Sequence, residues 1–588
     1  MFAILVVGMG SLAFSRSFSL SAVMPFTFLV LAFISVPLIR KSSSNSRVKW
    51  ADRKDAIGLI FAALACLVLL LPAYNRFHHL NGSAVTAFVA GNVDDSAHIE
   101  ALNDRLQYNQ VSFYHTNLAD KVRSQSVERG DYPIGWEAAN AAVVKAAAPS
   151  LRPGTASLKA YVATKFIWFF MLVFFFAYFA AWIFETILGR GGNRVETTLL
   201  CILILLFIFY FVFDVFRQGF FTFIPQLLCL PLCVLSLTAI KTAGWEQFWS
   251  IFTVAAVYAI GGGLSWLLVL PVLSLILVVG GFLQLKDLGF SILKQRLFYW
   301  KLLPVLPLYC LISLAVLAQL WMASHINGIS GGFLVSINQL GAIAQYNQNF
   351  YIIVAIGLAA LAVYSHRVKT TPAAVRISFL VATSLLAVAL LVYLVQIFSV
   401  ERTDYYYFKA LSTFTFLAIP LAIAGYACLF RHIAAQSSPS PILAALLVLG
   451  IVFFAGVPAG NSPTVSYLKG QLGLPVPVAN YVYDNIASLH AAAPAQHAFY
   501  YNSKDPLETD IANMLMKTMP QEHDCYRNVR PSFYDGSTPA AIARGIKASC
   551  SGYSITIATD AQTRAELASA FQSVKVSSVK LKTIPVTP

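Results

Sequence analysis

The chain has 588 residues, of which 58% are hydrophobic and only 11% charged, and its mean hydropathy is +0.69. A soluble globular protein of this composition is excluded, because it would lack the polar groups needed to cover its surface. The formal net charge of +15 comes from short basic segments between apolar runs. That distribution follows the positive-inside rule and argues against nucleic acid as a partner.

Apolar runs near the roughly 20 residues needed to cross a bilayer recur from the N-terminus to about residue 460. A second run, 19–39, follows the first almost at once without a small-residue cleavage site, so the first is not expected to be a cleaved signal. The sequence predicts a polytopic α-helical membrane protein with about 11–13 transmembrane helices. The predicted spans are 2–15, 18–39, 56–73, 161–188, 197–217, 219–240, 247–263, 264–283, 302–322, 349–366, 377–399, 409–430 and 441–460.

Loop charge predicts the orientation of these helices. Segment 40–54 carries six Lys and Arg residues and is expected in the cytoplasm, as are the basic loops near 190, 290 and 370. The N-terminus is then inside and the C-terminus outside. Three segments share the outer face of the plasma or inner membrane: a large first external loop at 74–160, the short loop 400–408, and everything after about 461.

This orientation divides the chain into a transmembrane domain, 1–460, and a small extracytoplasmic α/β domain, 461–588. In the second domain strand-like runs alternate with helical patterns, as in small α/β folds. The predicted strands are 497–502, 553–559 and 574–581, and the predicted helices are 505–519, 538–549 and 560–572. Cys525 and Cys550 lie outside the apolar runs and the cytoplasm, and we expect them to form a disulfide.

The external loop contains an acidic stretch, "GNVDDSAHIE", at residues 91–100. Its apolar residues predict a helix lying on the membrane surface, with Asp94 and Asp95 four and three positions before His98. A carboxylate beside an imidazole suits a general base or a divalent-metal site. We expect Asp94 to act as the base, with Asp95 orienting His98 or capping the helix. The alternative is a solvated cluster of loop charges.

A second cluster, "DYPIGWEAA", occupies residues 131–139 of the same loop. Tyr132 precedes a proline that favours an extended turn, and Trp136 falls at the start of the helix that follows. The two aromatic side chains suit either an interfacial membrane anchor or a platform for a sugar or lipid.

A third cluster, "ERTDYYYFKAL", stands at 401–411, where a helix re-enters the membrane from outside. Asp404, Tyr405 and Tyr406 precede Lys409, whose ammonium could hold a lipid phosphate at the interface. The alternative for Lys409 is ordinary snorkelling of a long side chain toward water.

Asp214 and Arg217 lie three positions apart near the outer end of the predicted span 197–217. Ionisable residues within a membrane are costly, so they usually face a cavity or a partner. Arg217 is a second candidate for phosphate binding, and a structural ion pair with Asp214 is the alternative.

Together, "DDSAHIE" in a first large external loop, "DYPIGW" after it and "YYYFK" at a later outer loop resemble the GT-C class of integral-membrane glycosyltransferases. The chain is distantly similar to bacterial arabinofuranosyltransferases. The resemblance implies an inverting transferase that takes a sugar from a polyprenyl-phosphate-linked donor to a glycan, lipid or protein acceptor of the cell envelope. It implies catalysis by Asp94 or Asp95, phosphate binding by Lys409 and Arg217, and substrate binding by His98, Tyr132, Trp136, Asp404, Tyr405 and Tyr406. Dependence on a divalent metal ion stays open.

Two other classes compete with the transferase. A transporter or lipid flippase would also be polytopic, but it would more often show internal repeats and midplane charges, and we find no clear repeat. A non-catalytic scaffold or lipid-binding protein is the third class. No Walker or Rossmann motif is found, which suits a lipid-linked rather than a nucleotide-linked donor.

Overall fold

The computed structural model describes twelve segments and six single residues of the chain. They are 57–67, 82–89, 93–110, 135–188, 224–239, 348–367, 373–400, 405–434, 476–489, 496–504, 538–550 and 552–584, with 272, 275, 509, 512, 513 and 516. This part of the protein is mainly helical, with one small sheet.

Three described helices contain segments long and apolar enough to cross a membrane: Thr155–Ile187, Val375–Phe398 and Lys409–Leu429. They belong to α7 (Thr155–Leu188), α16 (Ala373–Val400) and α17 (Tyr405–Ala434). Hydropathy alone predicts all three helices. In the structure α7 starts six residues before the predicted start at 161, because its first turns carry polar side chains that an apolar run does not include.

Three further predicted spans coincide with shorter helices: Ile57–Leu67, α9 (Ile224–Ala239) and α15 (Gln348–Arg367). Helix α9 packs with α7, α16 and α17, and α15 packs with α17. Val272 and Leu275 are helical, as the span 264–283 predicts. The remaining predicted spans lie outside the described residues: 2–15, 18–39, 197–217, 247–263, 302–322 and 441–460.

Helices α15 and α17 cross at very short range. A Cβ atom on Gly425 would collide with the carbonyl oxygen of Gly357, and one on Gly357 would lie 2.7 Å from the carbonyl oxygen of Ala422. The Tyr426 hydroxyl donates a hydrogen bond of 2.7 Å to the Ile353 carbonyl oxygen across the same crossing. Small residues that let helix backbones approach are the usual means of packing helices in lipid, where no hydrophobic effect holds them together.

Three helices from the predicted external loop pack against α7: α4 (Ser83–Val89), α5 (Val93–Tyr108) and α6 (Gly135–Ala147). Four of the apolar positions that predict α5 are buried: Ile99, Ala101, Leu102 and Leu106. Four polar residues of α5 are buried as well: His98, Asn103, Asp104 and Arg105. Helix α5 is covered by its neighbours on more than its apolar side.

The C-terminal region contains a parallel sheet in the order β1-β2-β3, formed by β1 (Gln496–Tyr500), β2 (Ser554–Thr559) and β3 (Val579–Thr583). The predicted alternation of strands and helices is confirmed here. Strand β3 starts later than expected, because the preceding helix continues to Val574 and ends at Lys575 in the left-handed conformation, with φ of 56°.

Helices α23 (Pro539–Ser549) and α24 (Ala561–Val574) lie where the sequence predicts them. Asp560 caps α24: its Oδ1 accepts hydrogen bonds of 2.9 Å from the backbone N–H groups of Gln562 and Thr563. Such a cap typically contributes about 1 kcal/mol. Within the predicted helix 505–519, the described residues are helical and recur on one face: Thr509, Ala512, Asn513 and Met516.

Cys550 follows α23 and is disulfide-bonded. Its predicted partner, Cys525, lies outside the described residues. Cys66 and Cys428, both in apolar helices, are buried, as expected for cysteines that act as small core residues.

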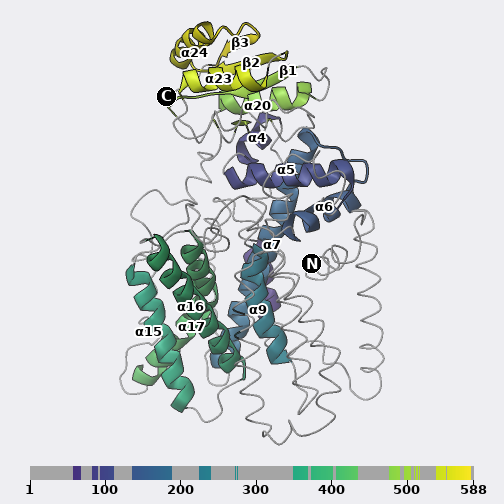
Figure 1. Cartoon of the computed structure of the whole chain (residues 1–588). Coiled ribbons are helices and arrows are strands. Elements are labelled where there is room, and N and C mark those ends of the chain that lie inside the picture. The colour runs from purple at the N-terminus through teal and green to yellow at the C-terminus, as the bar shows by residue number, and fades with distance from the viewer. Residues whose placement is uncertain are drawn as a thin grey trace, which may run out of the picture.

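One helix that the sequence analysis did not predict, α20 (Val476–Leu489), joins the sheet to the rest of the protein. It packs against α4 and α7. The hydroxyl of its Tyr481 donates a hydrogen bond of 3.2 Å to the Phe499 carbonyl oxygen of β1. Figure 1 shows the sheet with α20, α23 and α24 at one end, α15, α16 and α17 at the other, and α4, α5 and α6 between them.

Candidate functional site

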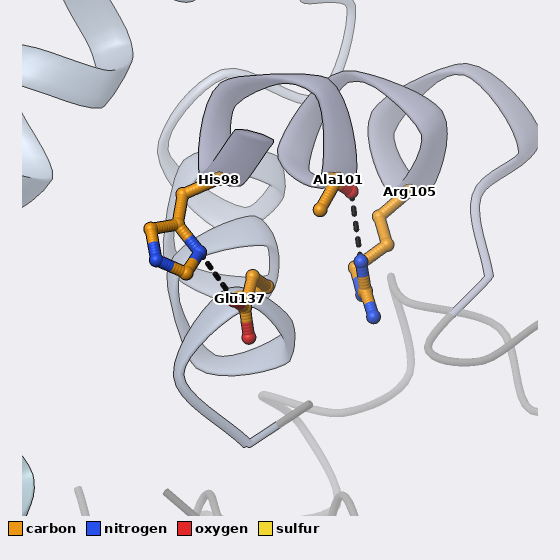
Figure 2. Close-up of polar contacts among 4 residues, drawn as sticks. All are labelled: His98, Ala101, Arg105 and Glu137. Carbon is orange, nitrogen blue, oxygen red and sulfur yellow. Dashed lines mark hydrogen bonds and ion pairs between the residues drawn. The ribbon is translucent and has the colours of Figure 1, made fainter. Parts of the chain in front are cut away.

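The candidate site is centred on a buried pair, His98 of α5 and Glu137 of α6. The two atoms that meet are His98 Nδ1 and Glu137 Oε1, at 2.7 Å (Figure 2). Only 4% of the His98 surface is exposed and none of Glu137. Glu137 lies in the first turn of α6, where the N-terminal end of the helix favours a negative charge.

A buried carboxylate needs a hydrogen-bond donor or a counter-charge, because burial removes its hydration. His98 supplies the donor at Oε1. The other carboxylate oxygen, Oε2, is buried and has no hydrogen-bond partner among the described residues. The pair is therefore held together across two helices but is incompletely satisfied.

Next to this pair, α6 is joined to α7 by a second buried contact. The Trp168 indole Nε1–H donates a hydrogen bond of 2.6 Å to Asn140 Oδ1. Asn140 follows Glu137 by three residues, so both side chains lie on one side of α6. This contact ties the layer of α5 and α6 to a helix that is long enough to span the membrane.

Two cationic side chains are also buried in this part of the protein. Arg105 of α5 is 1% exposed, and its Nη1 donates a hydrogen bond of 2.8 Å to the Ala101 carbonyl oxygen of its own helix (Figure 2). Lys165 of α7 is buried too, with its Nζ 5.2 Å from the centre of the Tyr161 ring. We call the set of His98, Arg105, Glu137, Asn140, Lys165 and Trp168 the buried polar layer.

Asp94 and Asp95, the predicted catalytic residues, lie on α5 one turn before His98. Their side chains are outside the described part of the protein. Because α5 begins at Val93, both are helical residues of the first turn, and the expected N-cap position of Asp95 is wrong. Carboxylates in a first helical turn still interact favourably with its exposed N–H groups.

Lys409, the predicted phosphate ligand, is only 2% exposed in α17. A lysine that snorkels to water would expose its ammonium group, so the structure does not favour that alternative. The Thr413 hydroxyl, one turn later in α17, donates a hydrogen bond to the Lys409 carbonyl oxygen. Two residues before Lys409, the centre of the Tyr407 ring lies 5.4 Å from the centre of the Tyr393 ring in α16.

For the other predicted substrate and phosphate ligands, the structure describes either the backbone alone or nothing. Trp136 lies directly before Glu137 in the first turn of α6, and Tyr405 and Tyr406 begin α17. The side chains of these three residues are outside the described part. Tyr132, Asp404 and Arg217 lie outside the described residues altogether.

Sequence reasoning missed Glu137, Asn140 and Trp168. It included Glu137 in the "DYPIGWEAA" cluster but considered only the aromatic residues there. The sequence does contain a signal: an acid and an amide stand three positions apart among alanines in "EAANAA" (137–142). Polar side chains on the apolar face of a helix are costly to bury, so they indicate a specific partner or function.

The structure does not decide whether the acidic stretch binds a metal ion. Among the described side chains, no three His, Cys, Asp or Glu residues gather in an arrangement that could hold a metal ion. The Asp94 and Asp95 carboxylates are not among those side chains.

No known protein family matches the chain, and no curated protein is significantly similar to it.

Proposed function

We propose that the protein is a membrane glycosyltransferase that moves a sugar from a polyprenyl-phosphate-linked donor to a cell-envelope glycan, lipid or protein on the outer face of the membrane. The observation that carries the proposal is the buried polar layer. It joins α5, the helix of the acidic stretch, to α6 and to α7, a candidate membrane-spanning helix. Side chains capable of acid–base chemistry are thereby joined to a candidate membrane-spanning helix.

The distribution of charge in the long apolar helices supports an enzyme over a transporter. Segments 168–184 of α7, 377–400 of α16 and 410–430 of α17 contain no Asp, Glu, Lys or Arg. Transporters more often carry ionisable residues near the membrane midplane, where their substrate binds. Here the charged residues stand near the ends of these helices, as a reaction at the membrane surface requires.

The chemistry follows from the donor. The acceptor hydroxyl oxygen attacks the anomeric carbon of the sugar, the bond from that carbon to the phosphate oxygen breaks, and polyprenyl phosphate leaves. In the proposed mechanism Asp94 takes the proton of the acceptor hydroxyl. Lys409 and Arg217 compensate the negative charge of the phosphate as it leaves.

The test compares Asp94→Asn and Asp95→Asn in a sugar-transfer assay with the protein in lipid nanodiscs. A general base typically contributes 10²–10⁴-fold in rate, so Asp94→Asn should lose about that much turnover and keep donor binding. Asp95→Asn is the matched control for removing one charge from the same helical turn, and we expect a smaller loss. Wild-type rates in both variants would refute the catalytic role of the acidic stretch.

The same assay separates a transferase from a transporter or flippase. A transferase releases polyprenyl phosphate together with the glycosylated acceptor. A transporter would move the intact donor between the two sides of a liposome membrane without breaking the sugar–phosphate bond. Appearance of intact donor on the far side, without product, would refute the transferase.

A further inference from the structure

The two outer edges of the C-terminal sheet differ in how their backbone groups are bonded. On the β1 edge, Asn513 takes the place of a neighbouring strand. Its Oδ1 accepts a hydrogen bond of 2.8 Å from the Tyr500 N–H, and its Nδ2 donates one of 2.8 Å to the Tyr500 carbonyl oxygen. The Thr509 hydroxyl accepts a hydrogen bond of 2.9 Å from the Asn502 N–H. Side chains therefore cover this edge, which is one way in which proteins prevent unwanted strand pairing.

The β3 edge has no such cover among the described residues. Strand β3 is the last in the order β1-β2-β3, and its hydrogen bonds to β2 include those of the Ser578 carbonyl oxygen and the Ile584 N–H. In a parallel ladder alternate residues of a strand bond to one neighbour, so the backbone groups of Val579, Leu581 and Thr583 point away from β2. No hydrogen bond from another described residue reaches these outward groups.

The side chains of β3 indicate what kind of strand fits this edge. Lys580 and Lys582 are exposed on one face of the strand, whereas Val579 and Leu581 are partly buried on the other and pack against the core. A neighbouring strand places its own side chains directly beside these, and opposite charges in such pairs are stabilising. Acidic residues on the lysine face and apolar residues on the other face would therefore match β3.

A second copy of β3 does not match it. Two copies related by a twofold axis pair antiparallel, and a pairing centred on Leu581 puts Lys580 of each copy opposite Lys582 of the other. Like charges directly opposite one another are destabilising. Lysines on edge strands commonly oppose self-association in this way. The same two charges attract an acidic strand.

We propose that the outer edge of β3 binds an extended acidic segment of a partner protein as an additional strand of the sheet. Backbone hydrogen bonds to Val579, Leu581 and Thr583 supply the attraction, and Lys580 and Lys582 select a segment with acidic residues at alternate positions. This interaction is separate from the proposed glycosyl transfer and does not depend on it.

The first test measures peptide binding to the full-length protein in phosphatidylcholine nanodiscs. The probe is a fluorescent seven-residue peptide with glutamate and valine at alternate positions. A peptide of the same composition with its glutamates consecutive has the same charge but cannot place them all on one face, and we expect it to bind at least about tenfold more weakly. Equal binding of the two peptides would show attraction by net charge alone and overturn the proposal. Absence of binding by either would leave the lysines as protection against pairing and would also overturn it.

The second test changes the charges on the protein. Replacing both lysines, Lys580→Glu with Lys582→Glu, turns two attractions into repulsions and should weaken binding of the alternating peptide about tenfold. The matched control is Lys504→Glu with Arg544→Glu, which changes the net charge equally at exposed positions on other elements. Equal losses in the two double variants would remove β3 from the binding site.

The third test detects the backbone hydrogen bonds themselves. Amide hydrogen exchange, measured by mass spectrometry with residue resolution, should slow at Val579, Leu581 and Thr583 when the peptide binds. At a peptide concentration ten times the dissociation constant, the slowing should be about tenfold. Unchanged exchange at these amides with peptide bound would place the peptide elsewhere. Slow exchange without peptide that becomes fast on dilution would identify a second copy as the occupant, and either result would overturn the proposal.

Discussion

At the scale of single residues, the buried polar groups carry most of the functional information. His98 is a candidate from sequence alone, because it stands one turn after two acids in a chain with few acids. Its described partner, Glu137, could not be found that way. Helical spacing relates residues three or four positions apart, whereas a contact across 39 positions depends on how two helices pack.

Lys409 provides the prediction that belongs to this scale. Its side chain is buried at the start of an apolar helix, where an ammonium group is costly without anionic or polar partners. Lys409→Met keeps most of the apolar stem but removes the charge. We expect affinity for polyprenyl phosphate, measured on purified protein, to fall about tenfold or more, as for the loss of a charged hydrogen bond.

Lys159→Met is the matched control for Lys409→Met. Lys159 also belongs to the first part of a candidate membrane-spanning helix, α7, but its side chain is exposed. Lys159→Met should therefore change the affinity for polyprenyl phosphate little. Equal affinities in wild type and Lys409→Met would remove Lys409 from the phosphate site.

At the scale of helices and strands, hydropathy predicts the positions of α7, α16 and α17 within a few residues at most ends. The reason is physical: every backbone group in lipid must be satisfied, so an apolar run of sufficient length has to be a helix. Helix α20 was missed although its buried residues have a helical spacing: Val478, Ala479, Tyr481 and Val482. This amphipathic pattern precedes the first strand-like run of the tail.

The crossing of α15 and α17 gives a prediction at this scale. Gly425→Ala places a methyl group against the backbone of Gly357 and Leu361, neither of which can move aside. Overpacking of this kind typically costs about 1–3 kcal/mol, so the free energy of unfolding in detergent should fall by that amount. Ala359→Val adds bulk to an exposed position of α15 and should change the free energy by less than about 0.5 kcal/mol. A Gly425→Ala protein as stable as wild type would contradict the tight crossing.

At the scale of the whole molecule, the tail and the predicted external loop form a continuous structure through the contact of α20 with α4. No sequence pattern predicts this contact, because the amphipathic pattern of α20 shows that one face is buried but not which helix covers it. The contact agrees with the expectation from loop charge that both segments lie on one side of the membrane. Two segments separated by many predicted spans can pack together only if they emerge on the same side.

The orientation itself is the last prediction. Single cysteines at Ser150, just after α6, and at Gln572 in α24 should both react with a membrane-impermeant maleimide on intact cells, since both positions are exposed and expected outside. A cysteine at Lys369 is the matched control. It stands in the basic segment after α15 and should react only after the membrane is permeabilised. Labelling of Lys369→Cys in intact cells, with Ser150→Cys and Gln572→Cys protected, would reverse the orientation and place the acidic stretch in the cytoplasm, where a donor on the outer face could not reach it.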